Sequence, residues 1–467
     1  VAALPDATGT GAVRDATGVS IDSRSLESGD VFVALIGPNA DGHAHVAGAL
    51  ARGAAAAIVA RVPDDLSLDA SLIRVADTQT ALEMLGHAAR ARSIARITAI
   101  TGSVGKTGTK EMLATVLAAQ QPTHRSVASH NNQWGVPLSL ARLPRDARFG
   151  VFELGMNHSG EIAALTRQVR PDVAIITTVE AAHLEFFGGI EAIADAKAEI
   201  FQGMTPDGAA ILNGDNPMLH RLAEAAATCG LRRILSFGTG PTADIRLIAA
   251  DADAGGSTIE AEILGHRLHY RLGQPGHHLV MNSLAVLGAV SLLGADLAKA
   301  GEALSRLSGL AGRGRQHKVP VGSGEALLID ESYNASPASM RAAFAVLAAA
   351  CPHANGRRIA VLGDMRELGD EAPSLHAALA EPLESAADLV FTAGPLMRHL
   401  YEALAPARQG AWQPDAAQLL PLLLGTLRPG DVVTVKGSLG SRMIDIVKPL
   451  LAGAADSAPI ASEKSPC

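Results

Sequence analysis

The chain has 467 residues, which is too long for one ordinary hydrophobic core and, at about 150 residues per domain, indicates roughly three domains. Hydrophobic residues make up 48 % of it and aromatic residues only 3 %, so we expect cores built from small aliphatic side chains. The net charge of −8 argues against a protein that holds nucleic acid through a general basic surface, because neutralising phosphates needs clustered lysines and arginines.

Residues 1–93 are predicted to form a small mixed α/β domain. Strands are expected at residues 30–36 and 55–60, with a turn and a short helix between them. Ser23 and Arg24 lie in an Asp-Ser-Arg turn before the first of these strands. A hydroxyl and a guanidinium suit a phosphate ligand, but an exposed turn without a ligand explains these two residues equally well.

The pattern of residues 96–120 predicts a short apolar strand, a glycine turn and a helix. In such a turn successive backbone N–H groups point at a phosphate, and the helix N-terminus adds partial positive charge. Lys106 is placed to reach the terminal phosphates of a nucleotide, and the Thr107 hydroxyl is placed to hold Mg²⁺. The usual G-x-x-x-x-G-K-[ST] spacing would need glycine where the chain has Ile100, so the match is to the shorter TGxxGKT form. The predicted loop comprises Thr101, Gly102, Ser103, Val104, Gly105, Lys106, Thr107 and Gly108.

Two later strands are expected to lead to candidate metal ligands. Residues 149–154 form an apolar segment whose carboxylate, Glu153, falls where an open parallel sheet places Mg²⁺ ligands. Residues 172–177 are almost continuously apolar, which is typical of a strand covered on both faces, and His183 follows them. A lone histidine is more often structural than a ligand. Lys197 lies in a predicted helix, where position alone marks it only as a solvated charge or a salt-bridge partner.

The hydrophobic period changes to two between residues 244 and 272, which predicts antiparallel hairpins in a small sheet at the edge of the central domain. Residues 279–295 then carry no charge, and this length is close to the lower limit for a membrane-spanning helix. Asn282, other small polar residues and two glycines interrupt the stretch, and a Pro-Gly pair precedes it. We therefore expect a buried helix and no membrane insertion.

A glycine-rich basic stretch at residues 309–318 is predicted to mark the second domain boundary; its arginines either close over a nucleotide or form only a linker. Beyond it, strand–helix units recur, which predicts a mostly parallel, Rossmann-like sheet with ligands at the carboxyl ends of its strands. We therefore expect an α/β chain whose central domain has a P-loop ATPase-type, mostly parallel sheet. The predicted domains are 1–93, 94–311 and 312–453, followed by a flexible tail at 454–467.

A phosphate loop flanked by two further domains leaves several classes of protein open. A switch GTPase would need a guanine-reading Asn-Lys-x-Asp element, which the sequence lacks. A small-molecule kinase would need one acceptor only and would not explain two other domains of this size. A ligase uses all three, because ATP activates a carboxylate as an acyl phosphate and an amine then displaces phosphate. A non-catalytic ATP-dependent interaction protein is a further alternative.

Eight separated motifs in one order carry a resemblance to a known family. They are TGSVGKTGTKE, HNNQWGVP, FELGMNHSGEI, EAAHLEFFG, ADAKAEIF, DESYNASPASM, VLGDMRELG and VKGSLGSRM. In these residues the chain resembles the Mur ligase family over almost its whole length, and within it the branch that adds a dipeptide. The resemblance implies a cytoplasmic step of peptidoglycan synthesis, in which UDP-N-acetylmuramoyl-tripeptide and D-alanyl-D-alanine are joined with ATP and two Mg²⁺ ions.

The resemblance also implies roles for particular residues. The phosphate loop would cradle the triphosphate, with Lys106 stabilising charge during transfer and Thr107 and Glu153 binding one Mg²⁺. His183 would bind a second Mg²⁺, and Lys197 aligns with a lysine that family members carbamylate. Asn282 would contact the adenine, and either Arg313 or Arg315 the phosphates. The residues expected at the UDP end are Ser23, Arg24, Asn39 and His43, and those expected along the peptide channel are Asn131, Asn132, Asn157 and His158. The residues expected to cap ATP and present the dipeptide are Tyr333, Asn334, Asp364, Arg366, Lys436 and Ser438.

The nearest alternative is a ligase of the same family that adds a single amino acid. Such ligases typically show a Tyr-Ala-His-Thr-Pro run where this chain has residues 332–337, SYNASP, so we favour the dipeptide. The third residue of the acceptor peptide, diaminopimelate or lysine, stays open. We expect no nucleic-acid partner and a monomer.

Overall fold

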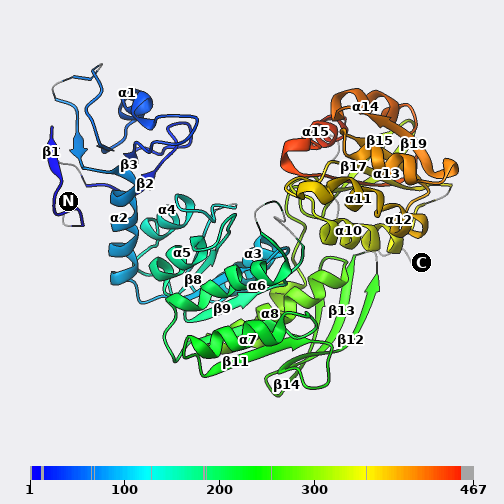
Figure 1. Ribbon diagram of the computed structural model, residues 1–467, viewed down its shortest axis with the longest axis horizontal. Coiled ribbons are helices and arrows are strands. Elements are labelled where there is room, and N and C mark those ends of the chain that lie inside the picture. Colours follow the sequence, from blue (N-terminus) through cyan, green and yellow to red (C-terminus); the bar gives the residue numbers. More distant parts are fainter. Residues whose placement is uncertain are drawn as a thin grey trace.

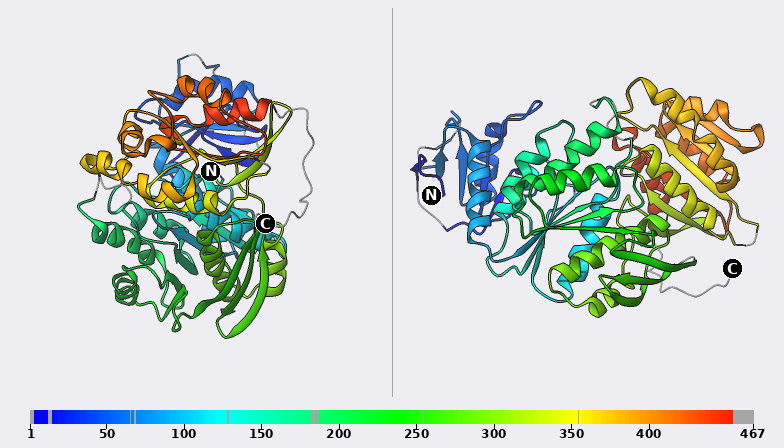
Figure 2. Two further views of the ribbon diagram at one scale, coloured as in Figure 1. Left: turned by 90° about the vertical axis from the view of Figure 1, so that its right-hand side faces the viewer. Right: turned by 60° about the horizontal axis from the view of Figure 1, so that its bottom comes forward.

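The protein is described by a computed structural model in which three bodies follow one another along the chain, each around its own sheet (Figure 1). The N-terminal and C-terminal bodies lie at opposite ends of the molecule, and the central body joins them (Figure 2). The described residues are 3–11, 15–64, 66–67, 69–127, 129–181, 185, 187–253, 255–353 and 355–453.

The N-terminal body is a small mixed α/β unit, as the sequence predicts. Its elements are β1 (Thr8–Thr10), β2 (Gly18–Ser20), β3 (Asp30–Val33), α1 (Val46–Ala51), β4 (Ala56–Val59), β5 (Leu72–Arg74) and α2 (Thr78–Arg92). The strand order is β1-β5-β4-β3-β2, with β2 to β5 parallel and β1 antiparallel at the edge. Leu82 of α2 packs in one cluster with Val33 and with Leu138 of the central body, so α2 forms part of the junction between the two bodies.

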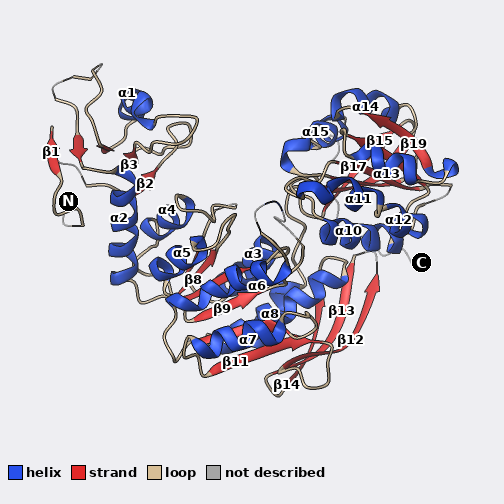
Figure 3. Ribbon diagram, viewed as in Figure 1, coloured by secondary structure: helices blue, strands red, loops and turns tan. Residues whose placement is uncertain are grey.

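The central body has a mostly parallel sheet with helices against it (Figure 3). Its strands are β6 (Arg96–Thr101), β7 (Thr123–Arg125), β8 (Phe149–Glu153), β9 (Val173–Ile176), β10 (Ala209–Asn213), β11 (Arg233–Gly238), β12 (Ile245–Asp253), β13 (Gly256–Ile263) and β14 (His266–Leu272). Its helices are α3 (Lys106–Ala118), α4 (Gly135–Ala141), α5 (Glu161–Val169), α6 (Ile190–Ala198), α7 (Leu219–Thr228), α8 (His277–Leu292) and α9 (Leu297–Leu304).

The strand order of this sheet, β14-β13-β12-β11-β10-β9-β6-β8-β7, brings the phosphate-loop strand β6 between β8 and β9. Side chains of β6 alternate between two cores: Ile97 and Ala99 belong to one, and Ile100 belongs to the other. A sheet covered on both faces explains the continuous apolar runs in its strands. Since β6 and β8 are parallel neighbours, their carboxyl ends lie together.

Two expectations about residues 244–295 are met. The predicted antiparallel strands are β12, β13 and β14, and they continue the central sheet because the start of β12 pairs with β11. The uncharged segment forms α8, most of whose residues are buried in the central core. Over the described ranges, the structure contains no helix that is long and apolar enough to cross a membrane.

The C-terminal body has a second mostly parallel sheet, in the order β15-β16-β20-β17-β18-β19. Its strands are β15 (Arg315–Val321), β16 (Gly324–Glu331), β17 (Arg358–Gly363), β18 (Leu389–Ala393), β19 (Gln409–Gln413) and β20 (Val432–Lys436). Its helices are α10 (Pro337–Ala349), α11 (Ala372–Ala377), α12 (Ala380–Ala386), α13 (Met397–Ala403), α14 (Ala416–Leu424) and α15 (Ile444–Ala452). The four predicted strands are β16, β17, β18 and β20.

The two strands that the sequence did not predict, β15 and β19, are the edges of this sheet. β15 lies partly in the basic stretch that we expected to be a boundary, and it pairs antiparallel with β16. Its sequence, RQHKVPV, and that of β19, QGAWQ, lack the apolar runs of buried strands. Edge strands tolerate polar residues and proline because one side of the backbone has no partner strand.

Candidate active site

The phosphate loop lies between β6 and α3 and requires glycine at two positions. Gly102 has a φ of 149° and Gly105 a φ of 86°, and residues other than glycine rarely adopt such values. A Cβ atom on Gly105 would lie 3.0 Å from Asn282 Nδ2, and one on Gly102 would collide with the Thr177 hydroxyl. The predicted adenine contact, Asn282, therefore lies directly against the loop.

The segment that follows β9 holds the loop in this conformation. Ser103 Oγ accepts a hydrogen bond from the Glu180 amide and donates one to the Glu180 carbonyl, both at 2.9 Å. Thr177 Oγ1 donates to the Val104 carbonyl at 2.6 Å. The Ser103 side chain thus fixes the loop to the segment after β9. The backbone N–H groups of such a loop are the donors that bind a phosphate.

Lys106, the first residue of α3, bends back over the loop. Its Nζ donates to the carbonyls of Gly102 and Ser103, at 2.6 and 3.2 Å. Burial lowers the pKa of Lys106; the charge of Glu153 opposes this decrease and that of Arg313 adds to it. The lysine is therefore within reach of whatever group occupies the loop.

Thr107 and Glu153 form an oxygen-rich corner beside Lys106. Thr107 Oγ1 donates to Glu153 Oε2 at 2.8 Å, and Asn131 Nδ2 donates to the other carboxylate oxygen at 2.8 Å. Glu153 is only 1 % exposed. A hydroxyl and a carboxylate are the oxygen ligands that Mg²⁺ prefers, so this corner fits the predicted cation. No group of three or more His, Cys, Asp and Glu side chains that could hold a metal occurs in the part of the chain that the structure describes.

The second predicted metal site can be located only in part. His183 lies outside the described residues. Lys197, on α6, is 2 % exposed and makes no hydrogen bond or ion pair with another described residue. Burial lowers its pKa well below the ordinary value, and the nearby charge of Lys106 lowers it further. A buried lysine of this kind, whose pKa is affected by the phosphate-loop lysine, differs from the solvated charge that helix position alone suggests.

A cavity of about 1020 Å³ opens over the phosphate loop and lies between the central and C-terminal bodies. Glu153 and the loop from Ser103 to Gly108 line one side of it. The bend is therefore open to a ligand rather than buried under packed side chains. Further predicted site residues that line the cavity are Asn131, Asn157, Asn282, Arg313, Tyr333, Asn334, Arg366, Lys436 and Ser438.

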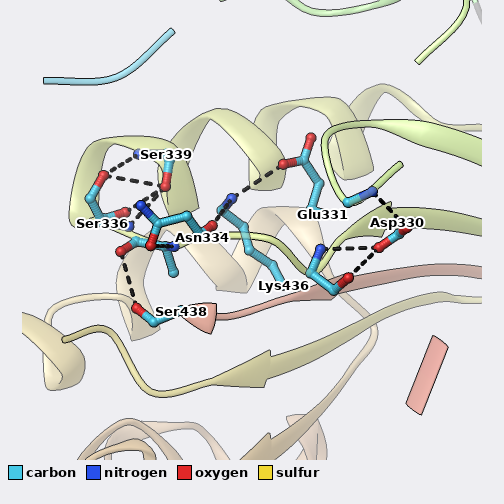
Figure 4. A network of polar contacts seen from close by, with 10 residues as sticks. Asp330, Glu331, Asn334, Ser336, Ser339, Lys436 and Ser438 are labelled. Atoms are coloured by element: carbon cyan, nitrogen blue, oxygen red, sulfur yellow. Dashed lines mark hydrogen bonds and ion pairs between the residues drawn. The ribbon is translucent and has the colours of Figure 1, made fainter. Parts of the chain in front are cut away.

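The C-terminal wall of the cavity carries positive charge held by hydrogen bonds. Lys436, at the end of β20, donates from Nζ to the Asn334 carbonyl at 2.9 Å and to Glu331 Oε2 at 3.2 Å (Figure 4). Arg313 lies over the Tyr333 ring at 4.1 Å from its centroid. Lys436 lies at the carboxyl end of β20, and Arg313 lies in the turn before β15, next to the carboxyl end of β16, so both charges lie at the same edge of the sheet.

Arg313 also connects the two bodies. Its Nη2 donates to Ser129 Oγ of the central body at 3.2 Å. The turn that carries it is held by Asp330, which accepts from the Gly312 amide at 2.7 Å. Arg315 is part of β15 and does not line the cavity. The geometry therefore favours Arg313 as the arginine that faces a nucleotide.

The residues predicted for the UDP end lie on the N-terminal body, near the carboxyl ends of β2 and β3. Ser23 is half-buried and Asn39 is exposed. Arg24 makes a forked ion pair with Asp22, and its hydrogen bonds lower the pKa of that carboxyl to about 2. The His43 ring is 2 % exposed; Nε2 accepts from the Ala60 amide at 3.0 Å and Nδ1 lies 2.6 Å from Asp41. Its ring is thus hydrogen-bonded inside the domain, and its expected contact with the UDP end stays a prediction.

Three other residues predicted to contact ligands have partners within the protein, and their roles toward a ligand stay predictions. Asn132 Oδ1 accepts from the amides of Trp134 and Gly135, at the start of α4. His158 is exposed and pairs with Glu161. Asp364 is buried, accepts from the Met397 amide at the start of α13, and does not line the cavity. Thr101 is also buried and does not line the cavity. A motif match cannot distinguish a residue that stabilises a turn from one that contacts a ligand, because both kinds of residue occur in the same turns.

Sequence reasoning missed residues that line the cavity outside the predicted set. One is Ser129, whose hydroxyl accepts a hydrogen bond from Arg313. The others are Glu111 and Arg125, which form an ion pair beside α3. Glu111 belongs to the motif that includes the phosphate loop, which was a usable signal. Arg125 and Ser129 precede the HNNQWGVP motif, and neither carries a pattern of its own.

Comparison with protein-family models divides the chain as the fold does. Residues 100–290 match the Mur ligase middle domain. Residues 314–439 match the Mur ligase glutamate ligase domain, and residues 15–93 match the Mur ligase family catalytic domain.

Individual proteins agree with these models. The chain is 34 % identical to the UDP-N-acetylmuramoyl-tripeptide–D-alanyl-D-alanine ligase of Escherichia coli (strain K12), over 92 % of this chain and 93 % of that one. The ligase of the same name from Bacillus subtilis (strain 168) is 33 % identical over 93 % of each chain. The crystal structure of MurF from Acinetobacter baumannii superposes with a TM-score of 0.81, at 33 % identity over 93 % of each chain. MurF from Thermotoga maritima in complex with ADP gives a TM-score of 0.78, at 27 % identity over 93 % of this chain and 97 % of that one. The chain belongs to the Mur ligase family.

Proposed function

We propose that the protein joins D-alanyl-D-alanine to UDP-N-acetylmuramoyl-tripeptide at the cost of ATP. The single observation that carries this proposal is the cavity in which a phosphate loop with Lys106, Thr107 and Glu153 faces the cationic wall of Arg313 and Lys436. Such a cavity presents cations to the phosphates of a nucleotide and to the carboxylates of the substrates. The printed names of the relatives at 33 and 34 % identity supply the identity of the substrates.

The first step is transfer of the terminal phosphoryl group of ATP to the tripeptide carboxylate. A carboxylate oxygen forms a bond to the terminal phosphorus, and the bond from that phosphorus to the bridging oxygen breaks and releases ADP. Lys106 and Arg313 stabilise the negative charge that develops on the transferring group. Thr107 and Glu153 would hold Mg²⁺, which supplies further neutralisation of phosphate charge when bound.

In the second step the dipeptide amine attacks the acyl carbon. The new C–N bond forms, the C–O bond to phosphate breaks, and the amine loses a proton as phosphate leaves. Lys436, held by Glu331 and Asn334, is placed at the C-terminal wall to orient an anionic group during this attack. Closure of the two bodies around the cavity would exclude water that could otherwise hydrolyse the acyl phosphate.

We further propose that Lys197 is carbamylated. Only a neutral amine attacks CO₂, and the lowered pKa of Lys197 favours the neutral form. The nitrogen forms a bond to the CO₂ carbon and loses a proton, which leaves an anionic carbamate facing Lys106. A carbamate there would orient a second Mg²⁺ together with His183, whereas an unmodified ammonium would repel it.

The remaining assignments follow from this scheme. Residues 1–93 would bind the UDP end through Ser23, Arg24 and Asn39, residues 94–311 ATP, and residues 312–453 the dipeptide. We propose action as a monomer. We also propose a cytoplasmic location in peptidoglycan synthesis, because ATP and UDP-linked peptides are available there.

A substrate panel tests the proposal. Phosphate release is measured with UDP-linked tripeptide and D-Ala-D-Ala, single L-amino acids or single D-amino acids as the amine. We expect release that requires both the tripeptide and D-Ala-D-Ala. Release with a single amino acid would indicate the alternative ligase, and release with the acceptor alone would indicate a kinase.

A further inference from the structure

A buried ionic network lies along α3, beside the cavity but outside the machinery described above. Lys110 is completely buried; its Nζ donates to the Ser126 carbonyl at 2.8 Å and pairs with Glu111 Oε1 at 2.8 Å. The second oxygen of Glu111 pairs with Arg125 Nε at 2.8 Å. Glu111 and Arg125 both line the cavity.

Glu111 pairs with two cations, Lys110 and Arg125, through its two carboxylate oxygens. Lys110 is inaccessible to solvent, so breaking its pair with Glu111 would be costly. The Arg125 side chain is 50 % exposed and its Nε pairs with Glu111; within the described ranges, its two Nη atoms donate no hydrogen bond. An exposed ion pair of this kind contributes little to stability. Stability of the fold therefore gives little reason for an arginine here.

The position of Arg125 separates it from the site of phosphoryl transfer. Glu111 lies one helical turn after Thr107 on α3, so the pair is about 6 Å further along the helix axis. After Arg125 the chain continues to Ser129 and Asn131, which contact Arg313 and Glu153. Arg125 thus lines the same cavity as the phosphate loop, beside Glu111 and one helical turn beyond Thr107, where it can meet a second anionic group of a bound substrate.

We propose that Arg125, held in place by Glu111 and Lys110, forms a carboxylate-binding subsite for a peptide substrate. The inference rests on the proposed function and names a contact within it. The planar guanidinium offers two parallel donors that match a carboxylate. The candidate ligands are two substrate carboxylates that survive the reaction: the C-terminal carboxylate of the dipeptide and, where the third acceptor residue is diaminopimelate, its side-chain carboxylate.

Steady-state kinetics distinguish the two candidate carboxylates. The variants are Arg125→Gln and Arg125→Lys, and the control is Arg145→Gln, an exposed change away from the cavity. KM is measured for ATP, for D-Ala-D-Ala and its C-terminal amide, and for acceptors ending in diaminopimelate or lysine. If the dipeptide fills the subsite, Arg125→Gln raises KM for D-Ala-D-Ala by about tenfold or more and leaves KM for the amide unchanged. If the acceptor fills it, the same increase occurs with diaminopimelate and not with lysine.

In either case Arg125→Lys should recover part of the loss, and Arg145→Gln should behave as the wild type. Unchanged KM values, an increase for ATP alone, or equal increases with and without the carboxylate would each overturn the subsite. Thermal unfolding of each variant checks that the fold is retained. Failure of the wild type to consume ATP with both substrates would refute the proposed function itself, whereas a normal wild type with an unaffected Arg125→Gln variant would refute only this inference.

Discussion

Thr107 and Glu153 are joined by a hydrogen bond of 2.8 Å between Thr107 Oγ1 and Glu153 Oε2, although 46 positions separate them in the chain. The contact exists because β6 and β8 are adjacent parallel strands, with Ile100 paired to Glu153, so that the helix following one strand meets the end of the other. The two oxygen groups therefore form one corner of the cavity, and a cation there would be bound by both.

Replacing Glu153 with Gln should raise the Mg²⁺ concentration needed for half-maximal activity by about tenfold or more. The amide keeps the size of the side chain and can still accept the Thr107 hydrogen bond, but it removes the negative charge that attracts the cation. Activity is measured as phosphate release across a Mg²⁺ titration. Glu224→Gln, an exposed change on α7, is the control, and an unaltered titration for Glu153→Gln would contradict the assignment.

Lys106→Ala should lower kcat by about 10²- to 10³-fold while leaving the melting temperature nearly unchanged. The ammonium is expected to stabilise charge that develops during phosphoryl transfer, and losing one such donor typically costs this much. Single-turnover phosphate release and thermal unfolding are the two measurements. Full activity of Lys106→Ala would refute the function of the loop. The control Lys299→Ala, on the exposed face of α9, should change neither kcat nor the melting temperature.

Lys197→Ala should abolish most activity, and added acetate or propionate should restore part of it. A short carboxylate can occupy the space of the missing carbamate and replace its charge. The rescue is measured against Lys448→Ala, whose side chain is exposed and should neither lose activity nor respond. Loss of activity without rescue would leave Lys197 important but unmodified, and no loss at all would remove it from the site.

His376 should make the stability of the protein depend on pH. Its Nε2 accepts from the Met365 amide at 3.0 Å and its Nδ1 lies 2.6 Å from the Ala372 carbonyl, so only the neutral ring fits. Burial lowers its pKa, while Asp364 opposes and His399 reinforces this decrease. The stabilisation is complete above the unfolded pKa of about 6.5 and is lost as the pH falls toward the lower folded pKa.

The corresponding measurement is urea unfolding of wild type and His376→Gln at pH 7.5 and 5.5. The difference in unfolding free energy between the proteins should shrink at the lower pH, by at most about 1.4 kcal/mol per pH unit. His220→Gln, an exposed control, should keep the wild-type slope. A constant difference between wild type and His376→Gln would show that protonation of this ring is not coupled to folding.

Asp364→Ala should destabilise the protein by about 1 kcal/mol without changing KM for the dipeptide. The carboxylate accepts the Met397 amide at the first turn of α13, and losing such a cap has this typical cost. Denaturant unfolding and KM are measured on the same preparation. A large KM increase at unchanged stability would restore the substrate contact that the motif suggested.

Much of the architecture was predictable because it depends on local sequence patterns. Apolar runs of the right length marked β8, β9 and four strands of the C-terminal sheet, and the glycines with Lys106 and Thr107 marked the phosphate loop. The period of two marked β12 to β14. The edge strands β15 and β19 were not predicted, because a strand with a partner on only one side needs no apolar run.

The sequence alone thus determined the fold class, the phosphate loop and the family, since these depend on local periodicity and on motifs whose order can be read directly. Only the tertiary structure decided which motif residues reach the cavity. It brought Thr107 to Glu153 and Arg313 to Ser129, and it turned His43 and Asp364 toward neighbouring backbone amides. The physical reason is that strand pairing and burial create these contacts between distant positions, and neither is encoded in the spacing of the residues that make them.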